Sequence, residues 1–175
     1  MTVLSILLIT LLSIIITALF IALFIPKDYA IERSIVIDKP VHTVFDYVKL
    51  LNNQEHYSKW VMRDPEKRVT NTGIDGTVGF KQAWIGKKAG EGEQEITGIA
   101  PDERITIAIR FVKPFKNTAH IYMATQPVTE HSTKVTWGMS GNSKYPINLM
   151  TAMMKGTLGN DMSTSLNYLK VILER

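Results

Sequence analysis

The pattern of apolar and polar positions divides the chain into an unbroken apolar segment and a longer stretch of alternating character. Every residue from Val3 to Ile25 is apolar or carries a small hydroxyl group. About 23 residues rising 1.5 Å each would cover the roughly 30 Å hydrocarbon core of a bilayer. A helix packed on the core of a small soluble protein would show a polar face, which this segment lacks. The pattern therefore predicts a transmembrane helix, with residues 1–27 as a membrane anchor.

A cleaved signal peptide is the alternative interpretation of this segment. Its apolar region would be roughly 7–15 residues long, preceded by Lys or Arg and followed by small residues at the cleavage site. No basic residue precedes Val3, and the segment Phe24–Lys27 is a poor cleavage site. A retained anchor is therefore favoured.

Basic residues beside the apolar segment indicate its orientation. Lys27, Arg33 and Lys39 follow the segment, whereas only the terminal amine precedes it. The positive-inside rule then places the rest of the chain in the cytoplasm. Arg33 and Lys39 could instead be committed to folded structure, so an outward-facing domain stays open. The expected arrangement is a single-pass membrane protein whose folded domain, residues 28–175, starts almost directly after the anchor.

Behind the anchor, the apolar positions change to the two-residue period of β-strands. Ile31, Ile35 and Ile37 share one face of the first such segment, and Gly, Pro and Asp at the breaks supply turn chemistry. The spacing predicts an antiparallel meander with one apolar face. Strands are expected at Tyr29–Ile37, Lys67–Asn71, Thr77–Ile85, Glu91–Ile99, Arg104–Val112, Asn117–Gln126 and Thr133–Ser140.

Helical spacing interrupts the strand pattern near both ends of the domain. The segment Asp38–Pro40 is a helix-start signal, and the apolar positions from Val41 to Val48 follow at helical spacing. A second short helix or helical turn is expected around Tyr57 and Trp60. The segment Ile147–Leu173 carries a stripe of Met and Leu at helical spacing, so a long helix should cover the apolar face of the sheet. The fold class is therefore α+β.

Composition narrows the classes of function. The 20 basic and 16 acidic residues are scattered along the chain, without the basic stripe that a nucleic-acid footprint requires. Cysteine is absent, which excludes disulfides, thiolate nucleophiles and thiolate metal ligands. The length of 175 residues leaves room for one domain beyond the anchor. No nucleic-acid partner is expected.

A series of short motifs accompanies this order of elements. They are Pro40, Trp60 and Asp64-Pro65, then Gly76–Gly79, Trp84 and Gly86, then Gly90–Gly92, and finally Leu158–Asp161 with Ser165-Leu166 and Leu169-Lys170. Together they resemble the helix-grip fold of the SRPBCC superfamily, also called START-like or Bet v 1-like, in its polyketide cyclase/dehydrase and lipid-transport branch. The resemblance covers Tyr29 to Arg175. It implies a curved sheet of about seven strands wrapped around the long C-terminal helix, two short helices after the first strand, and an apolar ligand cavity between sheet and helix. It implies no particular reaction.

Strand parity and helix spacing bring large, soft side chains to the expected cavity. Methionine adapts to irregular surfaces, so such a wall suits a variable apolar ligand. For any one of these residues, simple filling of the core is the alternative. The expected ligand-contacting residues are Trp60, Phe80, Gln82, Trp84, Ile107, Ile109, Phe111, Trp137, Met139, Met150, Met154 and Leu158, and Val78, Ile96, Val135 and Met153 share their inward orientation.

Few polar side chains could orient a ligand. Gln82 lies on the apolar parity of its strand and is the first candidate. Arg110, His120 and Tyr122 are weaker candidates, since Arg110 shares the polar parity of its strand and His120 would need a carboxylate such as Glu95 within reach. The four histidines have no metal-ligand spacing, and neither a nucleophile elbow nor a phosphate loop is present. No catalytic residue, metal or cofactor is expected.

The sequence thus favours binding or transport of a hydrophobic small molecule or lipid at a membrane. A polyketide cyclase or hydrolase-like enzyme is one alternative, and it would need at least two polar side chains converging in the cavity. A non-catalytic interaction or regulatory module is another, and it would have a filled core and an exposed apolar patch. The ligand's identity and the oligomeric state are left open.

Overall fold

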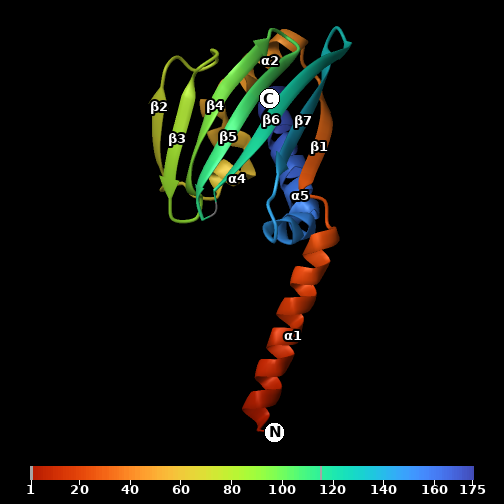
Figure 1. Ribbon diagram of the computed structural model, residues 1–175. Coiled ribbons are helices and arrows are strands. Elements are labelled where there is room, and N and C mark those ends of the chain that lie inside the picture. The colour runs from red at the N-terminus through yellow and green to blue at the C-terminus, as the bar shows by residue number, and fades with distance from the viewer. Residues whose placement is uncertain (1, 115) are drawn as a thin grey trace.

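The computed structural model describes residues 2–114 and 116–175. A long N-terminal helix, α1 (Val3–Phe24), projects from a folded body that contains all the other elements (Figure 1). The body comprises β1 (Asp28–Ile37), α2 (Val41–Val48), the 3-10 helix η1 (Leu51–Asn53), α3 (Gln54–Tyr57), α4 (Lys59–Met62), β2 (Arg68–Thr72), β3 (Lys81–Gly86), β4 (Gly90–Ala100), β5 (Arg104–Lys113), β6 (Asn117–Thr129), β7 (Ser132–Asn142) and α5 (Ile147–Glu174).

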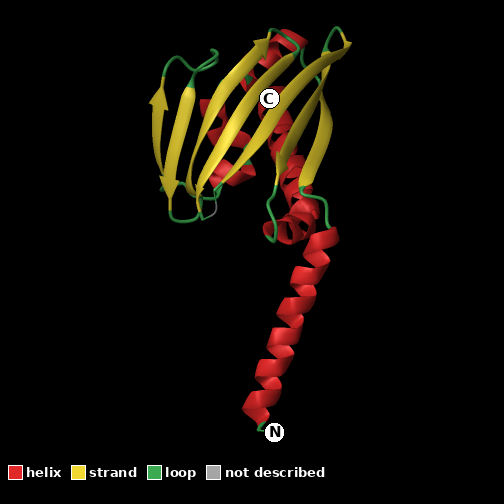
Figure 2. Cartoon of the chain, viewed as in Figure 1, coloured by secondary structure: helices red, strands yellow, loops and turns green. Residues whose placement is uncertain are grey.

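The strands form one antiparallel 7-stranded sheet in the order β1-β7-β6-β5-β4-β3-β2. Strands β2 to β7 are a meander, and β1 pairs with β7 at the edge opposite β2. The helices α2 to α4 connect the two edges, and they lie with α5 on the same side of the curved sheet (Figure 2). This arrangement confirms the expected α+β helix-grip fold, with a long C-terminal helix and short helices after the first strand.

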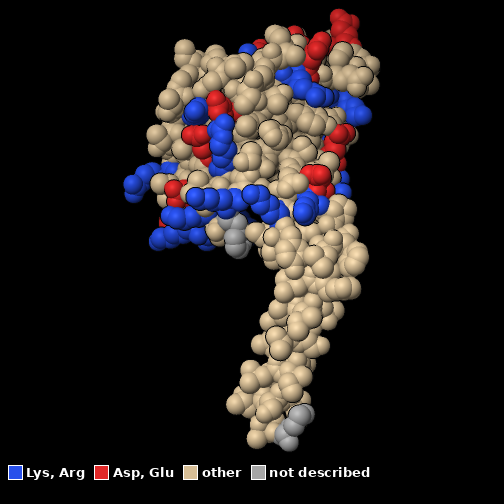
Figure 3. Space-filling model, in the orientation of Figure 1, with Lys and Arg blue, Asp and Glu red and all other residues tan. Residues whose placement is uncertain are grey.

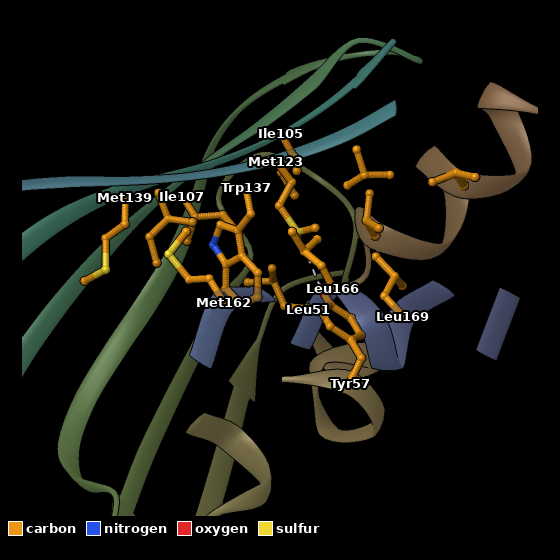
Figure 4. Close-up of a cluster of buried hydrophobic side chains, with 14 of the residues drawn as sticks. Leu51, Tyr57, Ile105, Ile107, Met123, Trp137, Met139, Met162, Leu166 and Leu169 are labelled. Atoms are coloured by element: carbon orange, nitrogen blue, oxygen red, sulfur yellow. Dashed lines mark hydrogen bonds between the residues drawn. The ribbon is translucent and has the colours of Figure 1, made fainter. Parts of the chain in front are cut away.

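The hydrophobic core fills the space between α5 and the sheet face that packs on it, which we call the inner face. Alternate residues of the strands point into it, as the two-residue period requires. Figure 4 shows Ile107, Met123 and Trp137 from the sheet facing Met162 and Leu166 of α5. All five side chains are buried. The second half of α5 is therefore the element that the sheet encloses.

One predicted strand starts later than expected. Thr77 to Phe80 form a turn, with Gly76 at φ +77° and Gly79 at φ +90°, and β3 starts only at Lys81. Glycine adopts positive φ values of this kind far more readily than other residues do. The inward orientation predicted for Val78 is wrong, since its side chain is 60% exposed. Val78 lies outside the strand, where side chains do not alternate regularly between two faces.

No linker separates α1 from the body. Asn148 of α5 donates from Nδ2 to the backbone oxygens of Ala22, at 2.7 Å, and Ile25, at 2.9 Å. The backbone N–H of Ser143 donates to the oxygen of Lys27 at 2.8 Å. The two bonds from Asn148 satisfy carbonyl groups that the end of a helix leaves without partners. The last turn of α1 is thus fixed to the first turn of α5.

Candidate ligand-binding site

A cavity of about 260 Å³ lies between the inner face of the sheet, the short helix α4 and α5. Its walls are mainly apolar, and amide and basic groups occupy part of them. The lining residues are Gln54, Ser58, Trp60, Val61, Arg63, Lys67, Val69, Gln82, Trp84, Lys88, Ala89, Gln94, Ile109, Phe111, Ile121, Trp137, Met139 and Leu158. A large apolar pocket with a few converging polar groups is the usual form of a small-molecule site.

Trp60 reaches the cavity from α4, a helix of 4 residues that is too short to be stable by itself. Its indole Nε1 donates to Asp161 Oδ2 at 3.2 Å, and Lys59 Nζ contacts Asp161 Oδ1 at 2.5 Å. The backbone N–H of Lys59 also donates to Ser165 Oγ at 2.9 Å. The C-terminal sequence motif containing Asp161 and Ser165 therefore attaches α4 to α5 and positions Trp60.

Trp84 and Phe111 form an aromatic wall, edge to face with ring centroids 6.1 Å apart. The Trp84 indole lies across Gly92 of the neighbouring strand. A Cβ at Gly92 would stand 2.5 Å from the indole and 2.8 Å from the backbone oxygen of Arg110, so any larger residue would displace the ring. Trp84 Nε1 donates to the oxygen of Ala89 at 3.2 Å. Gly92 is thus required for the shape of this wall.

Three buried glutamines converge at the cavity. Gln94 Nε2 donates to Gln82 Oε1 at 2.8 Å and to Gln54 Oε1 at 3.1 Å. Gln82 Nε2 donates in turn to Asn52 Oδ1 at 2.9 Å. Carboxamides both donate and accept, so this amide cluster (Gln54, Gln82 and Gln94) can exchange a hydrogen bond with a neutral polar group of a ligand. It offers a polar wall without a formal charge.

Asp64 fixes the turn between β3 and β4, residues 86–90, at the rim of the cavity. Its Oδ2 accepts from the backbone N–H groups of Lys88, at 2.7 Å, and Ala89, at 3.0 Å. The bond from Ala89, then that from Lys88, hold the pKa of Asp64 below its usual value. Gly86 makes room for this carboxylate, since a Cβ there would lie 2.4 Å from Asp64 Oδ2.

Trp137 lies where the cavity meets the core. Its ring packs edge-on against Trp60, with centroids 5.4 Å apart, and against Tyr57, at 6.3 Å. Its buried Nε1 has no hydrogen-bond partner among the described residues. An unpaired buried donor costs about 1–3 kcal/mol.

Most of the predicted ligand-contacting residues meet at this cavity. Phe80 and Ile107 instead lie fully in the core, at 2% and 1% exposed. Met150 and Met154 lie away from the cavity, at 43% and 44% exposed, in the first turns of α5. The predicted residues that line the cavity are Trp60, Gln82, Trp84, Ile109, Phe111, Trp137, Met139 and Leu158. Their contact with a ligand stays a prediction.

The polar candidates Arg110, His120 and Tyr122 do not line the cavity. Arg110 pairs with Glu95 at 2.8 Å and with Glu93 at 2.9 Å, and the bond to Glu95 is the main cause of its raised pKa. Glu95, considered above as a partner for His120, is thus engaged by Arg110. His120 is exposed on β6.

Tyr122 donates its hydroxyl hydrogen to Glu32, and this bond raises the pKa of the tyrosine. The guanidinium of Arg104 stands 4.4 Å above the ring centroid. These contacts place Tyr122 on the face of the sheet opposite α5.

Sequence reasoning missed Gln54 and Gln94. Gln94 lies on the same face of β4 as the buried Ile96 and pairs with Gln82 of β3, so strand parity could have identified it. Gln54 belongs to α3, a helix of only 4 residues. A single turn has no periodicity, and no pattern in the sequence indicates that its side chain is buried.

Comparison with solved structures identifies the fold. Norcoclaurine synthase from Thalictrum flavum aligns with a TM-score of 0.65 at 11% identity, covering 85% of this chain and 95% of that one. A protein from Chromobacterium violaceum aligns at 0.61 and 14%, covering 83% and 97%. DynU16, from the dynemicin biosynthetic locus, aligns at 0.59 and 12%, covering 83% of this chain and 47% of its own.

These likenesses define a Bet v 1-like, or SRPBCC-like, helix-grip fold. No protein-family model matches the chain, and no curated protein matches it in sequence. Identities of this size show the fold alone, so the function is argued from the site.

Proposed function

We propose that this protein binds a hydrophobic small molecule in the cavity between the sheet and α5, held at a membrane by α1. The observation that carries the proposal is the apolar cavity with the amide cluster in its wall. A core that binds no ligand would fill this space with its own side chains, because an empty cavity loses van der Waals contacts. Buried amides that face a cavity are suited to orienting a ligand through one or two hydrogen bonds.

The cavity's size and lining favour a small aromatic or short aliphatic ligand. Its volume of about 260 Å³ is just below the roughly 300–1,000 Å³ of typical ligand pockets. Trp60, Trp84 and Phe111 can contact the faces and edges of a ring. Norcoclaurine synthase has been solved in complex with dopamine and hydroxybenzaldehyde, so small aromatic molecules are compatible with this fold.

Anchoring by α1 is supported by the length and composition of the helix. It has 22 residues, and its 18-residue window with a mean hydropathy of 3.0 is only 6% buried against the body. At about 1.5 Å per residue, this length matches the roughly 30 Å hydrocarbon core. Ser and Thr are its only polar residues, and exposing the remaining side chains to water would be unfavourable. Residues 28–175 are then the ligand-binding domain outside the bilayer.

The binding proposal is tested by filling the cavity. Ile109→Trp adds an indole at a half-buried lining position of β5, and we expect the variant to fold but to lose the ligand. The full chain is purified in mild detergent, and bound small molecules are identified by native mass spectrometry and solvent extraction. The matched control is Ile85→Trp, which adds the same volume at a position 59% exposed on β3.

A stoichiometric apolar molecule in the unmodified chain and in Ile85→Trp, absent from Ile109→Trp, would support the proposal. An unmodified chain that carries no such molecule and does not bind an environment-sensitive aromatic dye would contradict it. If the retained molecule were chemically changed over time, the cyclase-type alternative would replace simple binding.

A further inference from the structure

A second, open groove lies at the end of the body from which α1 leaves. It has a volume of about 1310 Å³ and runs between the first turns of α5 and the adjoining ends of β1, β5, β6 and β7. Asp28, Ser143 and Lys144 line it. Because Ser143 is bonded to the backbone of Lys27, the groove starts within a few residues of the last turn of α1. With α1 in a bilayer, the groove opens at the level of the lipid headgroups.

One wall of the groove is apolar although it is open to solvent. Ile147, Met150 and Met154 line it from α5, and Tyr29 and Phe111 line it from the sheet. Met150 and Met154 are 43% and 44% exposed. The unbranched, polarisable methionine side chain suits contact with flexible apolar partners such as acyl chains. Phe111 also lines the inner cavity, so this residue borders both spaces.

The rim of the groove is basic. Figure 3 shows Lys and Arg side chains gathered along the edge of the body that adjoins α1. Lys113, Lys116 and Lys144 line the groove, and Lys113 pairs with Glu91 at 2.7 Å. Within residues 2–114 and 116–175, Lys116 and Lys144 form no ion pair. The acidic lining residue Asp28 accepts a hydrogen bond from Asn142 Nδ2 at 2.7 Å.

We propose that this groove binds an anionic phospholipid of the membrane that holds α1. The acyl chain would lie against Ile147, Met150 and Met154, and Lys116 and Lys144 would contact the phosphate. Juxtamembrane basic residues are attracted to anionic leaflets, and the apolar wall beside them matches the other half of such a lipid. The inference rests on the proposed anchoring by α1, but not on a ligand in the inner cavity.

The test uses the full chain in nanodiscs made of equal amounts of phosphatidylcholine and phosphatidylglycerol. Lipids that stay bound after release from the discs are counted by native mass spectrometry. The unmodified chain should retain phosphatidylglycerol in preference to phosphatidylcholine. Each lysine near an anionic surface contributes roughly a 5-fold preference. The double variant Lys116→Gln/Lys144→Gln should therefore lower the preference by roughly 25-fold or abolish it.

A matched control separates the groove from overall charge. Lys134→Gln/Arg175→Gln removes the same charge from two exposed positions, and the preference should persist. Lys134 pairs with Val36, at the end of β1 opposite Asp28, and Arg175 is the C-terminus, which lies away from α1 in Figure 1. Equal loss in both double variants would overturn the proposal. The proposal would also be overturned if excess inorganic phosphate abolished the preference while chloride of the same ionic strength did not. The lysines would then bind a soluble phosphate and not a lipid headgroup.

Failure of this proposal is distinguishable from failure of the proposed function. A chain that does not enter the discs would contradict anchoring by α1 and overturn the groove proposal with it. A chain that enters the discs but retains both lipids equally would overturn the groove proposal alone. The molecule in the inner cavity is measured independently, through Ile109→Trp.

Discussion

Asp64 shows how a single carboxylate can hold the rim of the cavity. It accepts two backbone N–H groups from the turn between β3 and β4, and its side chain is buried despite its charge. Hydrogen bonds to an ionised group are stronger than those between neutral groups. The position of Lys88 and Ala89, which line the cavity, therefore depends on the ionisation of Asp64.

Asp64→Asn should loosen the turn at residues 86–90. The amide oxygen can still accept both hydrogen bonds, but it carries no charge, so each bond is weaker. We therefore expect amide hydrogen exchange at Lys88 and Ala89 to become several-fold faster at pH 7. Glu66→Gln, an exposed neighbour, is the matched control. Exchange is measured by mass spectrometry. If its rate were equal in the two variants, Asp64 would not hold the turn in place.

The same contact gives a pH dependence of known sign. Because the folded state lowers the pKa of Asp64, its contribution to stability is fully present above the unfolded-state pKa of about 3.9. It is lost as the pH falls through the lower pKa of the folded state. The difference in exchange between Asp64→Asn and the unmodified chain should therefore be constant from pH 7 to about 5 and vanish in stronger acid.

At the level of single residues, strand parity was a useful but incomplete guide to the cavity. It brought Gln82, Trp84 and Ile109 to the right face of the sheet because each lies within a regular strand. It could not foresee that Gln54 would meet them, since that contact joins a one-turn helix to two strands. Hydrogen-bonded clusters between distant elements have no local signature in a sequence.

Among the elements, α5 changes character along its length. Its first turns expose Met150, Met153 and Met154, whereas Met162, Leu166 and Leu169 are buried under the sheet. The continuous Met and Leu stripe predicted one long helix but not this division. Spacing shows which residues share a helix face, and the edge of the sheet decides how far along the helix that face is covered.

The two glycines of α5 lie on either side of this division and should respond differently to alanine. A Cβ at Gly156 would meet no heavy atom within 4 Å, whereas at Gly159 it would lie 2.3 Å from the Arg33 guanidinium. Gly156→Ala should raise the free energy of unfolding by about 0.5–1 kcal/mol, from helix propensity alone. Gly159→Ala should bring a smaller gain, because the guanidinium of Arg33 on β1 must first move aside.

Urea unfolding of the full chain in mild detergent, followed by circular dichroism, measures both changes. The Arg33→Ala background supplies the control: with the obstacle removed, Gly159→Ala should become stabilising by a similar amount. If Gly159→Ala were as stabilising as Gly156→Ala in the unmodified chain, the close packing of α5 on β1 would not limit this position.

For the molecule as a whole, the order of elements was predictable and the joint between α1 and the body was not. The helix-grip topology follows from strand alternation, turn residues and the C-terminal stripe. The contact of Asn148 with Ala22 and Ile25 joins residues more than a hundred positions apart, and nothing in the local sequence around Asn148 indicates it.

The proposed orientation can be tested with introduced thiols, since the chain has no cysteine of its own. Lys134→Cys lies on the body and Thr2→Cys lies at the other end of α1. From the positive-inside rule, we expect a membrane-impermeant maleimide to label Thr2→Cys in intact cells and Lys134→Cys only after permeabilisation. The reverse pattern would place the body outside the cytoplasm.

The direct connection from α1 to β1 has a consequence for any cargo. With α1 in a bilayer, the body cannot leave that surface to visit another compartment, as a freely diffusing carrier does. A molecule held in the cavity would travel only by lateral diffusion in the plane of the membrane. Its delivery would require a recipient, either another protein or a closely apposed bilayer, to come into direct contact with the body.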